Sequence, residues 1–309
     1  MNITFKQLRA FCALYELRSF TAAARAIFVT QSAVSKLCAE LEAEVGQPLF
    51  ERSTRSVVPC EGAEDFYAYA QEILGTIRAA ERSMSGMRSL ERGKVGVATS
   101  PLMMVGLLGD VVALYHRKYP SVKLDLFELT TDDTIEHVRN GRVDFGIASM
   151  EETREDVLMT RVIYRDSMHV VCAPTHEFAA RSSLSWEDVA AQDHVMLRHV
   201  YGVRRSLDRV AADLSLEFRY GIEVAMLSSA LKLVGEGLGI TVVPGYASEP
   251  ARQLGLCVIG IEGARQHGHE LWLIQRRNAR LSLAAAAFLE ETEAYLQNRQ
   301  DFLTDAGTS

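Results

Sequence analysis

The segment from Ser19 to Glu42 has the pattern of two short helices joined by a tight turn. Ser19 can cap the first helix, and an alanine-rich run follows it. The run stops at Phe28, Val29 and Thr30, because aromatic and β-branched side chains suit an alanine-rich helix poorly. Thr30 can then cap the second helix. The segment therefore predicts a helical hairpin.

The second helix of this hairpin has two different faces. Apolar residues recur at spacings of three and four and predict the buried stripe: Val34, Leu37, Leu41 and Val45. The opposite face carries small residues, hydroxyls and one cation: Ser32, Ser35, Lys36, Ala39 and Ala43. Such a face can enter a major groove and bring short donors to the base edges. The alternative is an ordinary core hairpin, which periodicity alone does not exclude.

The residues after the hairpin favour DNA binding. Gly46 ends the second helix, and two short β-type runs follow, with Arg52 and Arg55 beside the turn between them. This pattern predicts a two-stranded wing suited to the phosphate backbone or the minor groove, although turn arginines are often only solvated. The residues predicted to contact DNA are Thr30, Gln31, Ser32, Ser35, Lys36, Arg52 and Arg55.

The chain from Phe5 to Gly62 resembles the winged helix-turn-helix of the LysR-type transcriptional regulators. The matching residues are Leu8, Phe11, Ser19, Phe20, Ala23, Ala24, Val29, Thr30, Gln31, Ala33, Val34, Ser35, Leu41, Glu42, Gly46, Pro48, Leu49, Phe50, Arg52, Arg55 and Gly62. The family often has proline where this chain has Ser32, and its linker proline lies one residue later than Pro59. The second departure predicts a shifted start of the next helix.

Charge and composition fit a DNA-binding module joined to an acidic body. Residues 1–60 hold seven Lys or Arg and five Asp or Glu, which gives a net charge of +2. The whole chain has a net charge of −7, so the remaining residues carry −9. A length of 309 residues suggests two or three domains. We find no apolar run of 18 residues, no signal peptide and no C-x-x-C pair among five scattered cysteines, and therefore expect a cytoplasmic protein without a membrane segment.

The segment from Glu61 to Leu90 lacks proline and predicts one long helix. An apolar seam runs along it at spacings of four and three: Phe66, Ala70, Ile73, Ile77, Ala80, Met84 and Met87. This spacing is typical of a coiled coil that pairs with a second copy, and the family's linker helices form its dimer. The alternative is that the seam packs against its own chain.

The rest of the chain alternates strands and helices, which predicts an α/β fold with parallel sheets. The expected strands are 95–98, 122–127, 144–148, 170–173, 195–197, 222–224, 240–243 and 269–274, and the expected helices are 107–119, 132–139 and 283–299. The resemblance implies a winged helix-turn-helix domain (1–60), a linker helix (61–91), effector lobe I (92–165 and 268–302), lobe II (166–267) and a C-terminal tail (303–309). Such paired lobes resemble periplasmic binding proteins, which hold a small molecule in their cleft.

Ligand-binding groups in α/β sheets gather beyond the carboxyl ends of the strands and at helix N-termini. This rule selects the candidate effector residues Thr99, Ser100, Pro101, Thr130, Thr131, Ser149, Arg198, His199, Tyr201, Gly202, Met226, Ser228 and Ser229. Hydroxyls and free amides suit a small organic anion, with Arg198 or, less favoured, Arg204 as its counter-charge. Each Ser or Thr could instead be an ordinary helix cap. Ser100 is the strongest candidate, because the resemblance also selects it.

Motifs for other chemistry are incomplete, so we expect no enzyme activity, cofactor or metal. Gly235-Glu-Gly-Leu-Gly239 follows a helix rather than a strand, the reverse of a dinucleotide loop. His267 and His269 lack further metal ligands and favour a hinge or surface position. Cys172 and Cys257 are far apart in the sequence, which disfavours a thiol-based redox sensor.

The sequence therefore predicts a dimeric or tetrameric transcriptional regulator that binds an interrupted palindrome in double-stranded DNA and responds to a small effector. A contact with RNA polymerase is compatible with this function. The alternatives are a redox-sensing regulator, a constitutive DNA-binding protein without effector, and an enzyme that carries a DNA-binding domain.

Overall fold

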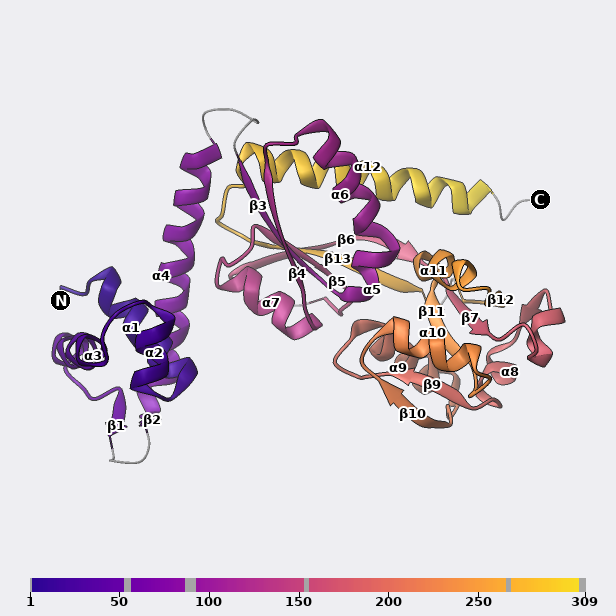
Figure 1. Ribbon diagram of the computed structural model, residues 1–309, viewed down its shortest axis with the longest axis horizontal. Helices are drawn as coiled ribbons and strands as arrows, with labels where there is room; N and C mark the ends of the chain where they lie inside the picture. The colour runs from indigo at the N-terminus through magenta and orange to yellow at the C-terminus, as the bar shows by residue number, and fades with distance from the viewer. Residues whose placement is uncertain (1, 53–56, 87–92, 153–155, 265–267, 306–309) are drawn as a thin grey trace. The chain divides into compact units, whose positions relative to one another are not determined.

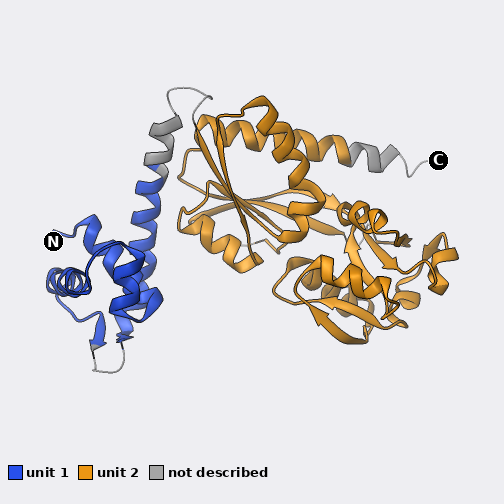
Figure 2. Cartoon of the chain, viewed as in Figure 1, with its two compact units in different colours: residues 1–81 blue, residues 82–309 orange. Residues whose placement is uncertain are grey.

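The computed structural model describes residues 2–52, 57–86, 93–152, 156–264 and 268–305. The chain divides into two compact units, Met1–Glu81 and Arg82–Ser309, which we describe separately (Figure 2). Across the described residues, the helices are all too short or too polar to cross a lipid bilayer.

The first unit is a winged helix-turn-helix followed by a long helix. Its elements are α1 (Phe5–Leu17), α2 (Phe20–Ala26), α3 (Gln31–Val45), the antiparallel strands β1 (Phe50–Arg52) and β2 (Val57–Pro59), and α4 (Glu61–Gly86). The predicted caps are confirmed, since Ser19 Oγ accepts from the Ala22 amide at 3.3 Å and Thr30 Oγ1 from the Ala33 amide at 3.2 Å. Gly46 ends α3 with a φ of 80°.

Aromatic packing holds this unit together. Phe11 of α1 is fully buried, and its ring centroid lies 5.4 Å from that of Phe50 in the wing and 5.0 Å from that of Phe66 in α4. Val34 and Leu41 of the predicted stripe are also fully buried. One core therefore fixes the hairpin, the wing and the start of α4.

The predicted coiled-coil seam of α4 is wrong at Phe66 and Ala70, whereas Ile73 of that seam is exposed. Ala70 is buried in the core of the helix-turn-helix, together with Leu74, and Phe66 packs against the same core. The apolar residues that α4 leaves exposed here are Tyr69, 67% exposed, and Ile73, 48% exposed. The physical reason is that the helix-turn-helix covers one face of α4 within its own chain, so that only the neighbouring face is free for a second helix.

The second unit contains two α/β lobes (Figure 1). Lobe I is built on a five-stranded sheet of order β4-β3-β5-β13-β6. Its strands are β3 (Lys94–Thr99), β4 (Lys123–Glu128), β5 (Phe145–Ala148), β6 (Leu158–Asp166) and β13 (His269–Arg276). Its helical segments are α5 (Pro101–Met103), the π-helical η1 (Met104–Leu108), α6 (Gly109–Lys118), α7 (Thr131–Arg139) and α12 (Leu283–Asp305). In Figure 1, α6 and α12 cover one face of the sheet and α7 covers the other.

Lobe II has a four-stranded sheet of order β11-β7-β12-β8 and a parallel pair, β9 and β10. Its strands are β7 (Met168–Cys172), β8 (Ser183–Leu184), β9 (His194–Leu197), β10 (Tyr220–Val224), β11 (Thr241–Pro244) and β12 (Cys257–Ile261). Its α-helices are α8 (Trp186–Ala190), α9 (Gly202–Leu214), α10 (Leu227–Gly235) and α11 (Ser248–Gln253), and two 3₁₀ segments are η2 (Glu177–Ala180) and η3 (Gly245–Ala247).

The α/β class and the two lobes are confirmed, as is the parallel pairing of β3 with β4 and β5 and of β9 with β10, but both main sheets also contain antiparallel strands. β13 is antiparallel to β5 and β6, and β7 is antiparallel to β11 and β12. The sequence interpretation also missed β6, β8 and β12. β6 is partly exposed along much of its length and lacks the apolar run that marks a buried strand.

The chain crosses between the lobes at two adjacent places. β6 leads into β7 at Asp166, and β13 begins at His269, which pairs directly with Asp166 in the sheet register. The buried carboxylate of Asp166 accepts hydrogen bonds from the backbone amides of Ser167, at 2.9 Å, and Tyr246, at 2.7 Å. The Tyr246 bond ties the crossing at Asp166 to η3, and the Tyr246 hydroxyl lies 3.1 Å from His269 Nε2 at the other crossing.

Candidate functional site

The outer face of α3 is the candidate DNA interface. Thr30, Gln31, Ser32 and Lys36 are exposed, and Ser35 is half-buried. The hydroxyls of Thr30 and Ser32 lie 3.0 Å apart, and Lys36 Nζ lies 3.8 Å from a carboxylate oxygen of Glu40. Residues 17–39 contain no acidic residue. The first half of α3 therefore presents donors and positive charge, and the first acidic residue of the helix is Glu40, which pairs with Lys36.

The predicted wing contacts fall largely outside the described residues. Arg52 ends β1, where it pairs with Val57, but its side chain lies outside the described residues, as does the whole of Arg55. Both stay predictions.

A small enclosed cavity of about 20 Å³ lies between the lobes, with room for about one water molecule. Its lining residues are Ser100, Pro101, Leu102, Thr131, Ser149, Leu197, Tyr201, Gly202, Val203, Ala225, Leu227, Tyr246, His269 and Leu271. Lobe I contributes the N-terminus of α5, where Ser100 Oγ accepts from the Met103 amide at 3.2 Å, and lobe II contributes the N-terminus of α9. The lining contains neither lysine nor arginine.

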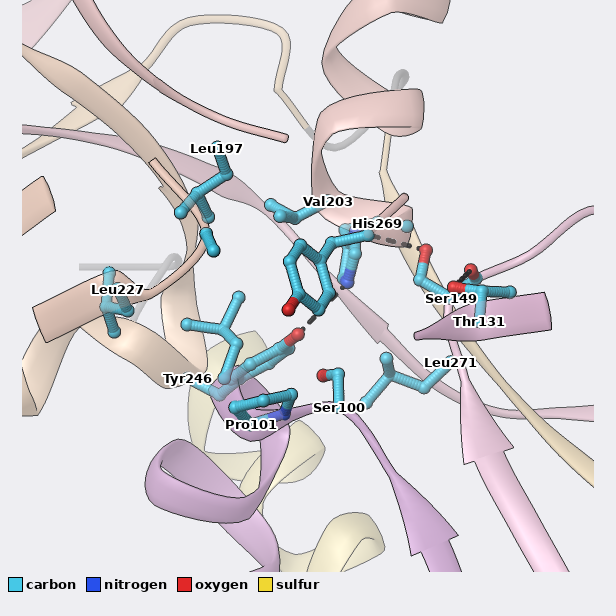
Figure 3. A pocket seen from close by; sticks show the side chains of 14 residues that line it. Ser100, Pro101, Thr131, Ser149, Leu197, Val203, Leu227, Tyr246, His269 and Leu271 are labelled. Carbon is cyan, nitrogen blue, oxygen red and sulfur yellow. Dashed lines mark hydrogen bonds between the residues drawn. The ribbon is translucent and has the colours of Figure 1, made fainter. Parts of the chain in front are cut away.

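His269 organises the polar side of this cavity (Figure 3). Its Nε2 lies 3.1 Å from the hydroxyl of Tyr246, and its Nδ1 lies 3.1 Å from the hydroxyl of Ser206 and 3.4 Å from that of Ser149. The backbone carbonyl of Ser149 in turn accepts a hydrogen bond from the Thr131 hydroxyl at 3.3 Å. One imidazole at the hinge therefore joins residues from both lobes in a single hydrogen-bonded network.

Burial sets the charge of the hinge. It lowers the pKa of His269 from 6.5 to about 3, so the imidazole is neutral at physiological pH. It also raises the pKa of the Asp166 carboxyl from 3.8 to about 6, although the amides of Tyr246 and Ser167 partly offset this change. A neutral imidazole can donate a hydrogen bond through one ring nitrogen and accept one through the other. A hydroxyl lies beside each nitrogen of His269 and can act as either partner.

We expect His269 to make the stability of the second unit depend on pH. Because the pKa of His269 is lower in the folded state, its contribution is complete above pH 6.5 and is lost as the pH falls toward 3. Asp166 acts in the opposite sense: because its pKa is higher in the folded state, its contribution to the free energy of unfolding grows as the pH falls from about 6 to 3.8. In His269→Phe, the loss of unfolding free energy between pH 7 and pH 4 should shrink by about 3 kcal/mol, measured by urea denaturation. An unchanged pH profile in His269→Phe would refute this assignment.

A larger cavity of about 560 Å³ opens beside the enclosed one and shares Thr131, Ser149 and Gly202 with it. The full lining is Thr131, Ile135, Ser149, Met150, Glu151, Glu152, His199, Gly202, Arg205 and Arg209. Ion pairs cross this cavity from one lobe to the other. Arg205 lies 3.1 Å from Asp132, and Arg209 lies 3.9 Å from Glu151. The larger cavity thus contains the cations that the enclosed one lacks.

The structure brings together about half of the predicted effector residues. Those at one or both cavities are Ser100, Pro101, Thr131, Ser149, His199, Tyr201 and Gly202. Those outside both linings are Thr99, Thr130, Arg198, Met226, Ser228 and Ser229. Thr99 is fully buried with its hydroxyl against the Met103 sulfur at 3.0 Å, and Thr130 caps α7, the ordinary role that the sequence left open.

The predicted counter-charges need correction. Arg204 is bound by Asp208 at 2.7 Å and Glu223 at 3.3 Å, and it stacks on the Tyr220 ring, so its charge is already balanced. Arg198 is exposed and lines neither cavity. The arginines that line the larger cavity are Arg205 and Arg209, because helix periodicity turns them, and not Arg204, toward lobe I. The strand-end rule selects residues that directly follow a strand, whereas Arg205 and Arg209 lie inside α9.

Sequence reasoning also missed Tyr246 and assigned His269 only to a hinge or the surface. Tyr246 follows β11 by two residues and is 2% exposed, so the strand-end rule could have selected it. His269 begins β13, where that rule does not apply. His267 lies outside the described residues.

The two cysteines of lobe II are neighbours despite their separation in sequence. Cys172 ends β7 and lies directly opposite Cys257, the first residue of β12. Cys172 is fully buried, and burial raises the pKa of its thiol to about 11. The reactive form of cysteine is the thiolate, so this environment does not favour redox sensing.

Family comparisons match both units. Residues 5–64 match the model of the bacterial regulatory helix-turn-helix protein, lysR family, and residues 88–297 match the LysR substrate binding domain. The uncharacterized HTH-type transcriptional regulator YfeR of Shigella flexneri is 28% identical over 93% of this chain and 92% of its own.

Solved structures share the fold over nearly the whole chain. A full-length OxyR variant from Pseudomonas aeruginosa has a TM-score of 0.71 at 20% identity, covering 96% of this chain and 95% of its own. Full-length CbnR complexed with its target DNA has a TM-score of 0.58 at 21% identity, covering 95% and 99%.

Proposed function

Because the chain belongs to the LysR family of DNA-binding transcriptional regulators, we propose that a small organic anion, bound between its two lobes, controls its binding to one operator. The family consists of regulators with an effector-binding domain rather than enzymes. The operator we expect is an interrupted palindrome in double-stranded DNA, occupied by two or four copies of the chain.

The observation that carries this proposal is the larger cavity. Arg205 and Arg209 supply positive charge there, and the N-termini of α7 and α9 reach its wall at Thr131 and Gly202. Helix N-termini and guanidinium groups both favour carboxylates. The acids of lobe I that now pair with the arginines, Asp132 and Glu151, are exposed and would turn to solvent at little cost.

The contacts between the lobes suggest how the anion would act. Arg205, Arg209 and Gly202 of lobe II all face lobe I, and the Thr131 amide donates to the Val200 carbonyl at 3.5 Å. An anion that binds both lobes would favour one closure of the cleft over another. In the oligomer, this change would alter the spacing of the DNA-binding units and the bend of the operator. Identical footprints and bend angles with and without the anion would contradict this mechanism.

A thermal-shift screen of the full-length chain with small mono- and dicarboxylates tests the proposal. A ligand at about 100 times its Kd should stabilise the second unit by about 2.7 kcal/mol. Replacing both Arg205 and Arg209 with alanine should abolish the shift, whereas Arg117→Ala, an exposed cation away from the cavity, should keep it. A shift that survives the double substitution would place the anion elsewhere.

On α3, we expect Lys36 and Gln31 to affect DNA binding differently. Lys36→Ala should weaken binding to every sequence and reduce the salt slope by about 1 for each bound copy, because it removes a phosphate contact. Gln31→Ala should instead reduce discrimination between operator variants by about 1–3 kcal/mol. Fluorescence anisotropy over a salt series measures both effects, and an equal loss on all sequences for Gln31→Ala would contradict base reading.

A further inference from the structure

Phe28 occupies a backbone position that normally suits glycine. The Phe28 amide donates to the Arg25 carbonyl at 3.3 Å, and the Val29 amide donates to the Ala24 carbonyl at 3.0 Å. These two bonds define the Schellman ending of α2, in which the residue after the cap adopts left-handed backbone angles. Phe28 has a φ of 59°, and a bulky side chain rarely adopts such an angle. The turn is therefore strained at this residue.

The phenyl ring gives the fold nothing in return for this strain. Phe28 is 92% exposed, the highest value among the exposed large apolar residues of the described chain. Its neighbour Ile27 packs against the core of the first unit and anchors the turn without help from the ring. A strained, exposed aromatic residue points to a contact outside the chain.

The surroundings of Phe28 identify DNA as that contact. The ring lies three residues before Gln31, the first residue of the helix that carries the base-reading side chains, and residues 28–32 are all exposed. Exposed Arg25 and Lys36 lie on either side in sequence, within the stretch 17–39 that has no acidic residue. An exposed apolar side chain in a stretch whose charged residues are all basic suits a DNA groove better than an apolar protein surface.

We propose that Phe28 reads thymine by placing its ring against the 5-methyl group of one thymine in each operator half-site. The 5-methyl group is the apolar feature of the major groove, and phenylalanine is among the side chains that recognise it. Phe28 would then add an apolar contact at the edge of the half-site to the polar contacts that α3 makes. This inference rests on DNA binding through α3.

The test begins with a duplex that the full-length protein selects from a random-sequence DNA pool. Each thymine of that duplex is then replaced in turn by uracil, which lacks only the 5-methyl group. The wild-type chain should lose roughly fivefold or more in affinity at one position of each half-site. Phe28→Ala should lose a similar factor on the parent duplex and show no further loss with uracil at that position.

Phe28→Gly separates the contact from the strain. It should match Phe28→Ala in its DNA affinity, but it should melt at a higher temperature, because glycine adopts the left-handed angle freely. Ser215→Gly is the control for relief of strain alone. It relieves a φ of 55° at the end of α9 and should raise stability without changing DNA affinity.

The possible outcomes separate the role of Phe28 from DNA binding itself. Wild-type affinity in Phe28→Ala, or a loss that no uracil position reproduces, would overturn the thymine contact. Normal DNA affinity with reduced transcription in a reconstituted assay would assign the ring to a protein partner instead. Failure to select any duplex would contradict DNA binding and not Phe28 alone.

Discussion

Gly202→Ala should prevent the two lobes from closing and abolish the response to the effector. A Cβ atom at this position would lie 2.1 Å from the backbone carbonyl oxygen of Ser149 and 2.6 Å from its Cβ atom, across the cleft. Backbone cannot move aside as a flexible side chain can, so the lobes would have to separate by more than about 1 Å to reach an ordinary contact distance. Overpacking of this kind destabilises a protein by about 1–3 kcal/mol.

Urea denaturation should show this loss of stability, and the carboxylate found in the thermal-shift screen should no longer protect the variant. Hydrogen exchange at the Thr131 amide should become faster, because its bond to the Val200 carbonyl spans the same gap. Gly221→Ala is the matched control in lobe II, since nothing lies within 4 Å of the added Cβ atom. If Gly202→Ala retains both wild-type stability and the ligand response, this closure is not the one that binds the effector.

Phe11→Ala should unfold the DNA-binding unit and leave the effector lobes intact. Phe11 is fully buried among Tyr15, Phe50 and Phe66, and it therefore joins α1 to the wing and to α4. Removing a buried phenyl ring destabilises a core by about 3–5 kcal/mol, which is a large part of the stability of a domain this small. DNA binding should fall below detection in fluorescence anisotropy.

Calorimetry of the full-length variant should show the melting of the second unit unchanged, with the transition of the first unit shifted to a lower temperature or lost. Phe5→Ala removes the same ring from the same helix at a position that is 38% exposed, and it should cost less than about 1 kcal/mol. Wild-type DNA affinity in Phe11→Ala would show that the three-part core is not required to hold α3 in place.

The sequence determined the features that depend on residues close together in the chain. The caps at Ser19 and Thr30, the terminating Gly46 and the two faces of α3 all follow from hydrogen bonds and periodicity within a few residues. The same local signals located most of the strands and three hydroxyl residues at the cleft, Ser100, Thr131 and Ser149. They also indicated the two lobes, with the resemblance to a known family giving their order.

Tertiary structure decided which of these local features meet. It paired β7 antiparallel to β11 and β12 and joined His269 to Tyr246, pairings between residues too far apart in sequence for local periodicity to specify. It balanced the charge of Arg204 and left Arg205 to face lobe I, a difference of one residue that depends on how α9 is rotated in its packing. It also buried Ala70 of α4 in the core of the first unit and left its neighbour Tyr69 exposed. A local pattern limits which faces a helix can bury, but the partner of each face is set by the packing of the whole chain.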